Sequence, residues 1–421
     1  MRQFIRLVVL RKPGYPTVMK PNSLVLLLVP IAVLAGCDVA VQQFPPNELH
    51  ALVVSTSRQA PADVAAEDTT ALVDAWFGTP DSPLWPTEQL VDPAARELIN
   101  VDNLKRASGR VYSDRENRHF GLYNEHCVTC HGVSGGGDGP AALLQNPYPR
   151  DFRAGVFKWK STERSARPTR EDLLAVLQRG ASGSAMPTFR NVDEADLQAL
   201  VDYVLYLSVR GEFERQMLAD AVDELGYDET RPDDDASLLA VLDSRGEAFA
   251  TEVARGRLNE IVERWIDASG QVIEVPAETP ANSDSIIRGK ELFHGQIANC
   301  VGCHGPGGRG GVPTVDFDDW TKEYTTRLSV TPSDKEAVRP FRQAGALRPR
   351  QIDPRQLDTG VFRGGGDSET LYRRIVTGIA GTPMPAREVA ESPSPTSLTS
   401  DQIWDLVHYV QAITGKVDEP R

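Results

Sequence analysis

A five-residue motif, Cys-x-x-Cys-His, occurs twice in this chain and constrains its fold more than any other feature. The two copies are Cys127–His131 and Cys300–His304. On a helical turn, residues at positions i, i+3 and i+4 lie on one face. The two thiols and the imidazole of each copy therefore point the same way, toward one bound group. The whole chain has only five cysteines and seven histidines among 421 residues, so two such copies are not a coincidence of composition.

This spacing is the attachment signature for covalent c-type haem. The two thiols reach the two vinyl groups of one porphyrin, and the histidine beside the second thiol falls under the iron. We therefore predict two covalently bound haem c groups, attached through Cys127, Cys130, His131, Cys300, Cys303 and His304, with both histidines as iron ligands. The alternative is zinc, which Cys-x-x-Cys pairs also bind. A four-cysteine zinc site would join segments about 170 residues apart and would leave both histidines unexplained.

The fifth cysteine, Cys37, ends an N-terminal targeting segment. Residues 1–36 carry five basic residues and no acid, and their apolar run, Leu24–Leu34, is too short for a good membrane span. The ending Leu-Ala-Gly-Cys resembles the bacterial lipoprotein signal, which implies cleavage before Cys37 and lipid on that residue. An uncleaved anchor, or ordinary secretion with a stray cysteine, is the alternative. We expect a protein of the cell envelope, lipid-anchored to a membrane and facing the periplasm.

The strongly negative net charge limits which macromolecules the protein is expected to bind. The chain carries −14 at pH 7, and removal of residues 1–36 takes away only positive charges, leaving about −19. Such a surface excludes nucleic acid as an expected partner. It favours redox proteins that carry a basic docking patch.

The two halves of the chain repeat each other well beyond the pentapeptide. Three pairs of segments match: Phe120–Tyr123 with Arg288–Phe293, Leu173–Met186 with Leu371–Met384, and Leu200–Val204 with Leu406–Val410. The middle pair keeps a constant offset of 198 residues. The first pair predicts a helix that leads into each haem motif, and the last pair has the apolar spacing of a helix.

Each half therefore has a helix with the haem motif, a glycine-rich loop, a helix, a Met-Pro loop and a final helix. This order resembles the class I cytochrome c fold over a little more than half of the chain. The resemblance implies an all-α protein of two tandem class I modules, joined by an acidic, partly helical linker and preceded by an N-terminal extension. The predicted boundaries are 1–36 for the signal peptide, 37–104 for the extension, 105–210 for the first module, 211–282 for the linker and 283–417 for the second module.

Methionine is the expected sixth ligand of each iron. Only Met186, Met217 and Met384 remain after residue 36, and the first and last occupy equivalent places in the repeat, each followed by proline. Proline fixes its own φ and favours extended geometry at the preceding residue, which stiffens the loop. Core packing is the usual role of methionine. Paired position, scarcity and the family resemblance favour Met186 and Met384 as ligands, and a filled coordination sphere suits electron transfer.

The other histidines near the motifs, and Met217, are not expected to bind iron. We predict that His408 lies on a helix surface because it aligns with Asp202, and that Met217 packs a helix. His126 should point away from its own iron. The remaining rivals, His119 and His294, are expected to be exposed on the helices that lead into the motifs.

Two loop features have further interpretations. Glycine-rich segments Gly132–Gly139 and Gly305–Gly311 follow the motifs, without the preceding strand or the Gly-Lys-Ser/Thr ending of a phosphate loop. Glycine there would let the backbone pass close to a large flat ring. Arg150 or Trp159 is a candidate hydrogen-bond donor to a haem propionate, and a solvated arginine with a packed indole is the alternative.

The rest of the chain lies outside the repeat. Tryptophans Trp76 and Trp85 of the extension should pack onto the first module or onto a partner subunit. The acidic run Asp220–Asp235 predicts a solvated linker. Leu238–Ile266 predicts one or two amphipathic helices, with Gly246 or Gly256 as the candidate break, lying across the junction of the modules. An insertion within Val312–Gln343 is either partner-facing or a surface excursion.

These features predict a membrane-tethered dihaem c-type cytochrome that transfers single electrons and is not an enzyme. By resemblance, a terminal oxidase or a quinol-oxidising complex is a candidate redox partner. One alternative is a dihaem peroxidase, which needs one iron with an open position. Another is an electron-entry subunit held within a larger oxidase or dehydrogenase complex.

Overall fold

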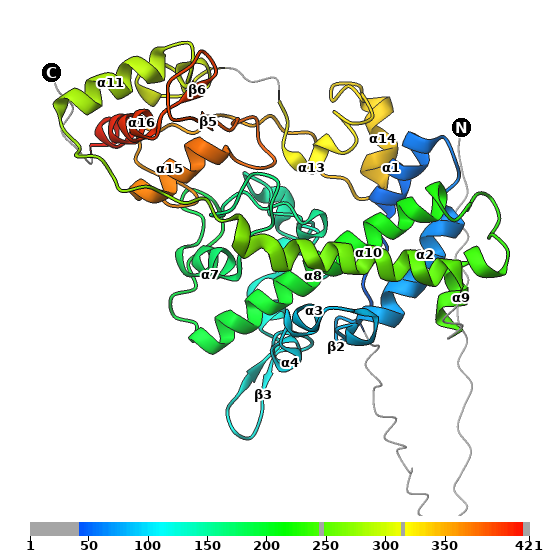
Figure 1. The fold of residues 1–421 in the computed structure, drawn as a ribbon. Helices are drawn as coiled ribbons and strands as arrows, with labels where there is room; N and C mark the ends of the chain where they lie inside the picture. Colours follow the sequence, from blue (N-terminus) through cyan, green and yellow to red (C-terminus); the bar gives the residue numbers. More distant parts are fainter. Residues whose placement is uncertain (1–41, 244–247, 313–315, 416–421) are drawn as a thin grey trace, which may run out of the picture. The chain divides into compact units, whose positions relative to one another are not determined.

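Helices joined by loops make up most of the described chain (Figure 1). The computed structural model describes residues 42–243, 248–312 and 316–415, all within the unit Val41–Arg421. Cys37 and the predicted signal peptide lie outside these residues. Within these described ranges, the strands form three pairs, and each strand is two residues long: β1 Gly78–Thr79 with β2 Ser82–Pro83, β3 Tyr112–Ser113 with β4 His119–Phe120, and β5 Glu388–Val389 with β6 Ser397–Leu398. The predicted helical class is confirmed.

Short 3-10 helices connect the longer elements. They span Thr87–Gln89, Ala142–Leu144, Phe152–Ala154, Asp234–Ala236, Asp267–Gln271 and Pro306–Gly308. Among the residues that the structure describes, no helix is both long enough and apolar enough to cross a bilayer.

The N-terminal extension packs on the long final helix of the first module. Its helices are α1 Glu48–Arg58, α2 Asp63–Phe77, α3 Pro93–Glu97 and α4 Val101–Ala107, and that final helix is α8 Glu194–Asp223. Trp76 stacks on Phe213 of α8 with ring centroids 5.2 Å apart. The Tyr206 hydroxyl donates to the Phe77 carbonyl oxygen at 2.6 Å. Trp76 therefore packs on the first module, which is one of the two predicted surfaces, whereas the Trp85 indole packs within the extension and donates to the Ala95 carbonyl oxygen at 3.1 Å.

The approach to the first haem motif is not the predicted helix. Phe120 lies in β4, its ring stacks on Tyr112 of β3 at 4.9 Å, and Gly121 has a φ of 77°. That left-handed conformation breaks any helix, so only α5 Leu122–His126 precedes α6 Val128–His131. Helix α4 takes over the packing against α8. The module continues with α7 Arg170–Arg179.

In the second module the corresponding prediction is correct. The helices are α11 Ser283–His294, α12 Val301–His304, α15 Ser368–Thr377 and α16 Ser400–Ile413. Helix α11 leads into the motif and crosses α16 at Gly289, where a Cβ atom would lie 1.9 Å from the Asp405 carbonyl oxygen. The Arg288 guanidinium closes the same contact with two hydrogen bonds of 2.8 Å to the Asp405 carboxylate. The absence of a side chain at Gly289 is therefore what lets these helices touch.

The linker is more ordered than its acidity predicts. Helix α8 continues to Asp223, and the buried Asp220 accepts a 2.7 Å hydrogen bond from Arg257 of the next long helix. Two helices follow, α9 Leu238–Leu242 and α10 Phe249–Ile266. Gly256 does not break the second helix, and the other predicted break, Gly246, lies outside the described residues. Helix α10 packs along α8 (Figure 1), where the Trp265 indole donates to Glu212 at 3.0 Å. The prediction that these helices span the junction of the modules is wrong, because their apolar stripe is used by the first module.

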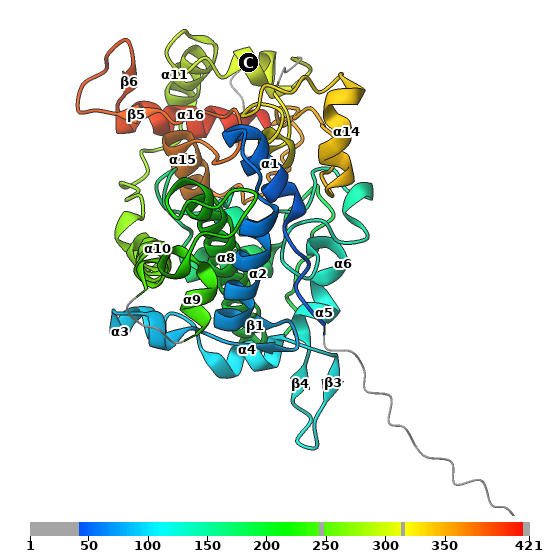
Figure 2. The same cartoon turned by 90° about the vertical axis from the view of Figure 1, so that its right-hand side faces the viewer.

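The insertion in the second module reaches the first module and the extension. It carries α13 Asp319–Lys322 and α14 Lys335–Gln343. Trp320, Tyr324 and Phe341 share a small apolar core with Leu49 and Val53 of α1, and α14 lies beside α1 in both views (Figures 1 and 2). The Trp320 indole also donates to the Pro149 carbonyl oxygen at 2.9 Å. The insertion therefore packs against other parts of the same chain. The sequence predicted either a partner-facing segment or a surface excursion, and neither prediction included this packing.

One ion-pair cluster fastens the insertion. Glu323 accepts from Arg215 of α8 at 2.7 Å and lies 2.7 Å from Nδ1 of His50 on α1. Burial alone would raise the pKa of Glu323, but the Arg215 guanidinium and the His50 hydrogen bond hold it well below its usual range. The carboxylate therefore contributes stability that is fully present above its unfolded pKa of about 4.5 and is lost as pH falls through its lower folded value.

Replacing Glu323 with glutamine is expected to lower the free energy of unfolding by about 3 kcal/mol at neutral pH, because the largely buried Arg215 loses its countercharge. Denaturant titrations across pH measure the difference from the wild-type protein. That difference should be constant above about pH 5 and shrink below it. The exposed Glu229→Gln is the control and should change stability by less than about 0.5 kcal/mol. A deficit that persists undiminished into acid would contradict the assignment.

Candidate haem sites

Each motif histidine is oriented by an equivalent hydrogen bond to a backbone carbonyl oxygen. Nδ1 of His131 lies 2.9 Å from the Arg150 carbonyl oxygen, and Nδ1 of His304 lies 2.8 Å from the Arg355 carbonyl oxygen. A carbonyl can only accept, so Nδ1 must carry the proton. The lone pair is then on Nε2, which is the tautomer that a metal-binding histidine uses.

Burial keeps both rings in the form that binds iron. It lowers the pKa of His131 to about 4 and holds the pKa of His304 below its ordinary value. His131 also stacks on Phe152 with ring centroids 4.5 Å apart. Each imidazole is therefore neutral and fixed in orientation, as a ligand must be.

The four motif cysteines lie at two short helical turns, and Cys127 is buried. In the described part of the chain, no three His, Cys, Asp or Glu side chains gather as a metal cluster requires. The four thiols thus do not form one group, as the zinc alternative requires. The two pairs instead offer each of two porphyrins its own attachment points.

The two Met-Pro loops have the same backbone. Gly180 and Gly378, at the ends of α7 and α15, both have φ 66° and ψ −162°. The carbonyl oxygens of Met186 and Met384 each accept a hydrogen bond of 3.2 Å from the first residue after that glycine. Their amides each donate to a hydroxyl two residues earlier, at 3.3 and 3.2 Å. Two loops built alike present two half-buried methionines alike, and their ligation of iron remains a prediction.

The glycine loops close back onto the motif histidines. The Gly137 amide donates to the His131 carbonyl oxygen at 2.8 Å, and the Gly310 amide donates to that of His304 at 2.6 Å. Gly132 and Gly305, which directly follow the histidines, have φ of 73° and 70°. A left-handed turn is therefore the observed reason for glycine at these positions, and close passage beside a ring stays untested.

Among the rival ligands, two predictions are wrong: those for His408 and for His119, which is half-buried in β4 and not exposed on a helix. His408 is fully buried, with Nδ1 3.0 Å from the Ser285 hydroxyl and Nε2 3.3 Å from Glu278, so it is not on a helix surface. His119 pairs with Glu125, and His294 donates from Nδ1 to a carbonyl of its own helix. His126 packs on Phe189, and its orientation away from the iron stays a prediction. Met217 is buried on α8, as expected.

Sequence reasoning missed Arg355, although a signal for it existed. The dipeptide Pro-Arg occurs four times in the sequence, and the arginine carbonyls of two copies, Pro149-Arg150 and Pro354-Arg355, accept from the motif histidines. The distances along the chain conceal the match. The acceptor follows the first histidine by 19 residues and the second by 51, because the insertion lies between.

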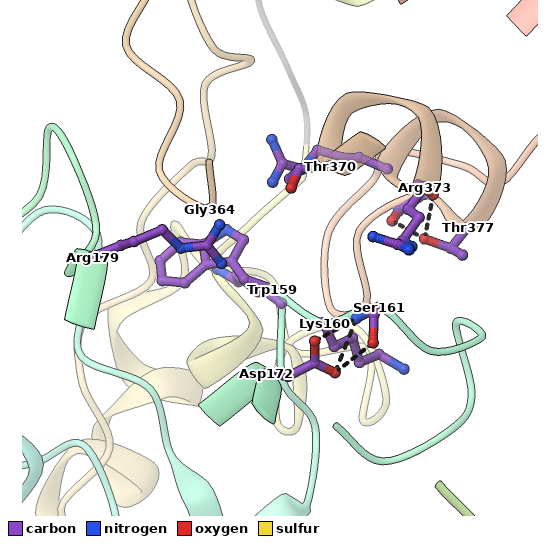
Figure 3. Close-up of a pocket in the computed structure, with 12 residues that line it drawn as sticks. Trp159, Lys160, Ser161, Asp172, Arg179, Gly364, Thr370, Arg373 and Thr377 are labelled. Carbon is purple, nitrogen blue, oxygen red and sulfur yellow. Dashed lines mark hydrogen bonds between the residues drawn. The ribbon is translucent and has the colours of Figure 1, made fainter. Parts of the chain in front are cut away.

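A cationic cavity of about 160 Å³ lies where the modules meet (Figure 3). It is lined by Lys158, Lys160, Arg179, Arg373 and Arg374, and by one carboxylate, Asp172. Asp172 is already occupied, since it accepts from the amide and hydroxyl of Ser161. Trp159 lines this cavity beside Gly364. Arg150 does not line it, and its carbonyl oxygen accepts the hydrogen bond from His131. A carboxylate suits this cavity, and a propionate contact by Trp159 stays a prediction.

Comparison with known proteins agrees with this geometry. The family model described as Cytochrome c matches residues 120–208 and 286–414, which together make up more than half of the chain. The chain belongs to the cytochrome c family, and its two modules imply two covalently bound haem c groups with iron.

A solved structure of the reducing HAO-like protein complex of Kuenenia stuttgartiensis is also similar. It shares 22% identity, with a TM-score of 0.43, over 70% of this chain and 94% of the other. No curated protein sequence matches the chain.

The side chains present fit the haem groups. In each module a neutral, oriented imidazole follows two thiols on one turn, and a Met-Pro loop of matching backbone accompanies them. Those are the donors that a covalently attached, six-coordinate haem requires. The same set recurs twice with the same hydrogen bonds, so the two sites are expected to do the same kind of chemistry.

Proposed function

We propose that this cytochrome is a dihaem carrier, tethered to a membrane, that passes single electrons between respiratory partners. The observation that supports it best is the second copy of the whole ligand arrangement, from histidine-to-carbonyl bond to Met-Pro loop. An enzyme needs one iron with an open position, whereas a carrier needs both filled. Two alike loops favour the carrier.

In this proposal the protein's own residues do the positioning. His131 and His304 would each hold one iron, with the ring oriented by its carbonyl partner, and Met186 and Met384 would supply the second protein ligand. Bound haem supplies an iron that gains or loses one electron at a time. The surrounding chain keeps water and other ligands from the metal, and soft thioether ligation raises the reduction potential.

The attachment to a membrane and the partners belong to the same proposal. Lipid on Cys37 would hold the protein at the periplasmic face of a membrane, and several acyl chains anchor far more firmly than one. The excess of acidic residues favours a redox partner with a basic patch, such as a terminal oxidase or a quinol-oxidising complex.

A potentiometric titration followed by optical and magnetic spectra tests the function. Two low-spin centres are expected, each with the weak near-infrared band of sulfur-to-iron ligation, and the reduced protein should not bind carbon monoxide readily. A high-spin centre, or turnover of hydrogen peroxide by the half-reduced protein, would favour a peroxidase instead. Cell fractionation tests the tether: Cys37→Ser should move the protein from the membrane to the soluble periplasm without loss of haem.

A further inference from the structure

One arginine of the first module reaches the Met-Pro loop of the second. Nη1 of Arg164 donates to the Met384 carbonyl oxygen at 2.7 Å, and Nη2 donates to the Thr382 carbonyl oxygen at 2.9 Å. Gly378 makes room for this contact, since a Cβ atom there would lie 2.4 Å from Nη1. We propose that Arg164 is a positioning residue that keeps the sixth ligand of the second iron in place. The inference rests on the proposed function, because it requires Met384 to be that ligand.

The segment that carries Arg164 is itself firmly held. Thr162 is fully buried and forms an isolated antiparallel bridge with Val272 of the linker. On either side of that bridge, backbone hydrogen bonds of 2.9 Å join Glu163 to Gln271 and Ile273 to Ser161. Lys160 donates to carbonyl oxygens at both ends of the turn, those of Glu163 and Ala166. The guanidinium therefore projects from a rigid support.

The linker connects this support to the second module as well. Arg373 of α15 donates to the Ile273 carbonyl oxygen at 3.2 Å. Helix α15 is the helix that ends at Gly378 and leads into the Met384 loop. The loop is thus reached from the first module by two routes, directly through Arg164 and indirectly through the linker.

Among the described residues, no side chain of the second module donates a matching pair of hydrogen bonds to the Met-Pro loop of the first module. Arg355 lies against that loop, since a Cβ atom on Gly183 would be 2.5 Å from Nη2 of Arg355. Its Nε, however, donates to the Val361 carbonyl oxygen at 2.9 Å, within its own module. The position of the Met384 loop therefore depends on an arginine of the first module. The Met186 loop does not depend on the second module in the same way.

The physical reason is the weakness of the bond to be protected. A thioether is a neutral ligand at the end of a flexible side chain, so its hold on iron depends on where the loop backbone lies. A guanidinium that binds two carbonyl oxygens fixes both position and direction. Removing it should let the loop open more often and expose the second iron.

The test uses the full-length holoprotein carrying Met186→His, so that any sulfur-to-iron band comes from the second haem alone. In that background, Arg164→Gln should weaken the band and increase the affinity of the reduced second haem for carbon monoxide by about tenfold, the size expected for lost charge-assisted hydrogen bonds. The exposed Arg190→Gln, also in the first module, removes the same charge and should change neither reading.

A lysine variant separates position from charge. Arg164→Lys keeps the positive charge but cannot form the two-pronged contact, so it should resemble the glutamine variant. The inference is overturned if Arg164→Gln leaves both readings unchanged, or if Arg164→Lys behaves like arginine. If the parent protein itself lacks the band, Met384 is not the ligand, and the proposed function fails before Arg164 is changed. Denaturant unfolding of each variant shows whether the modules stay folded.

Discussion

Replacing Met186 with histidine is expected to lower the midpoint potential of the first haem by a few tenths of a volt and to leave the second haem nearly unchanged. The identity of the axial ligand sets haem potentials over a range of about 0.8 V, and methionine opposite histidine is the high-potential pair. Imidazole is a stronger donor than a thioether, so it stabilises the oxidised iron. Potentiometric titration with two resolved midpoints measures the change.

The repeat supplies a control for this experiment. Met384→His should produce the mirror-image result, with the second midpoint lowered and the first retained. Met217→Leu preserves volume at a buried position of α8 and should move neither potential. If Met186→His left both midpoints in place, Met186 would lose its assignment as a ligand, whatever the loop geometry.

A methyl group at Gly289 is expected to destabilise the second module by about 3 kcal/mol, at the upper end of what overpacking costs. Gly289→Ala would place a Cβ atom 1.9 Å from the Asp405 carbonyl oxygen, which belongs to the backbone of α16 and cannot rotate away. The two helices must separate, and the buried ring contact between Phe293 and Tyr409, now 5.2 Å, opens with them. Denaturant unfolding followed at the second haem gives the loss.

The same substitution elsewhere provides the matched control. Gly256 lies within α10, and no atom would meet a Cβ there within 4 Å. Gly256→Ala should therefore be stabilising, by up to about 1 kcal/mol, because alanine is the better helix former. Equal effects at the two glycines, of either sign, would mean that helix contact does not decide the outcome at Gly289.

The comparison of Gly121 with Gly289 shows why the fold was only partly predictable. Both glycines stand before a haem motif and look equivalent in the sequence, yet one has a φ of 77° beside a hairpin and the other lies within a helix. The hairpin depends on the stacking of Tyr112 on Phe120. The hydrophobic periodicity of the sequence does not predict that contact.

The candidate sites were easier to predict than their surroundings. The motifs and Met-Pro loops depend on local spacing, so a repeat exposes them. The carbonyl partners of the histidines could have been found from Pro149-Arg150 and Pro354-Arg355, but unequal spacing hid the match. His408 and Trp320 depend on distant elements, respectively Ser285 and Pro149, and burial by a distant segment leaves no mark in local sequence.

Helix α8 has one more consequence. At 30 residues it is about 45 Å long. From Leu197 to Glu214 every residue is buried except Gln198, which is half-buried. The half nearer its start closes the first haem module, whereas Phe213 and Met217 in its later half lie among residues of the extension and of α10. A fragment cut at residue 210 would sever a helix that runs through one hydrophobic core, which the first module shares with the extension and α10. Any attempt to isolate the first redox centre should therefore retain everything from residue 42 to the end of α10.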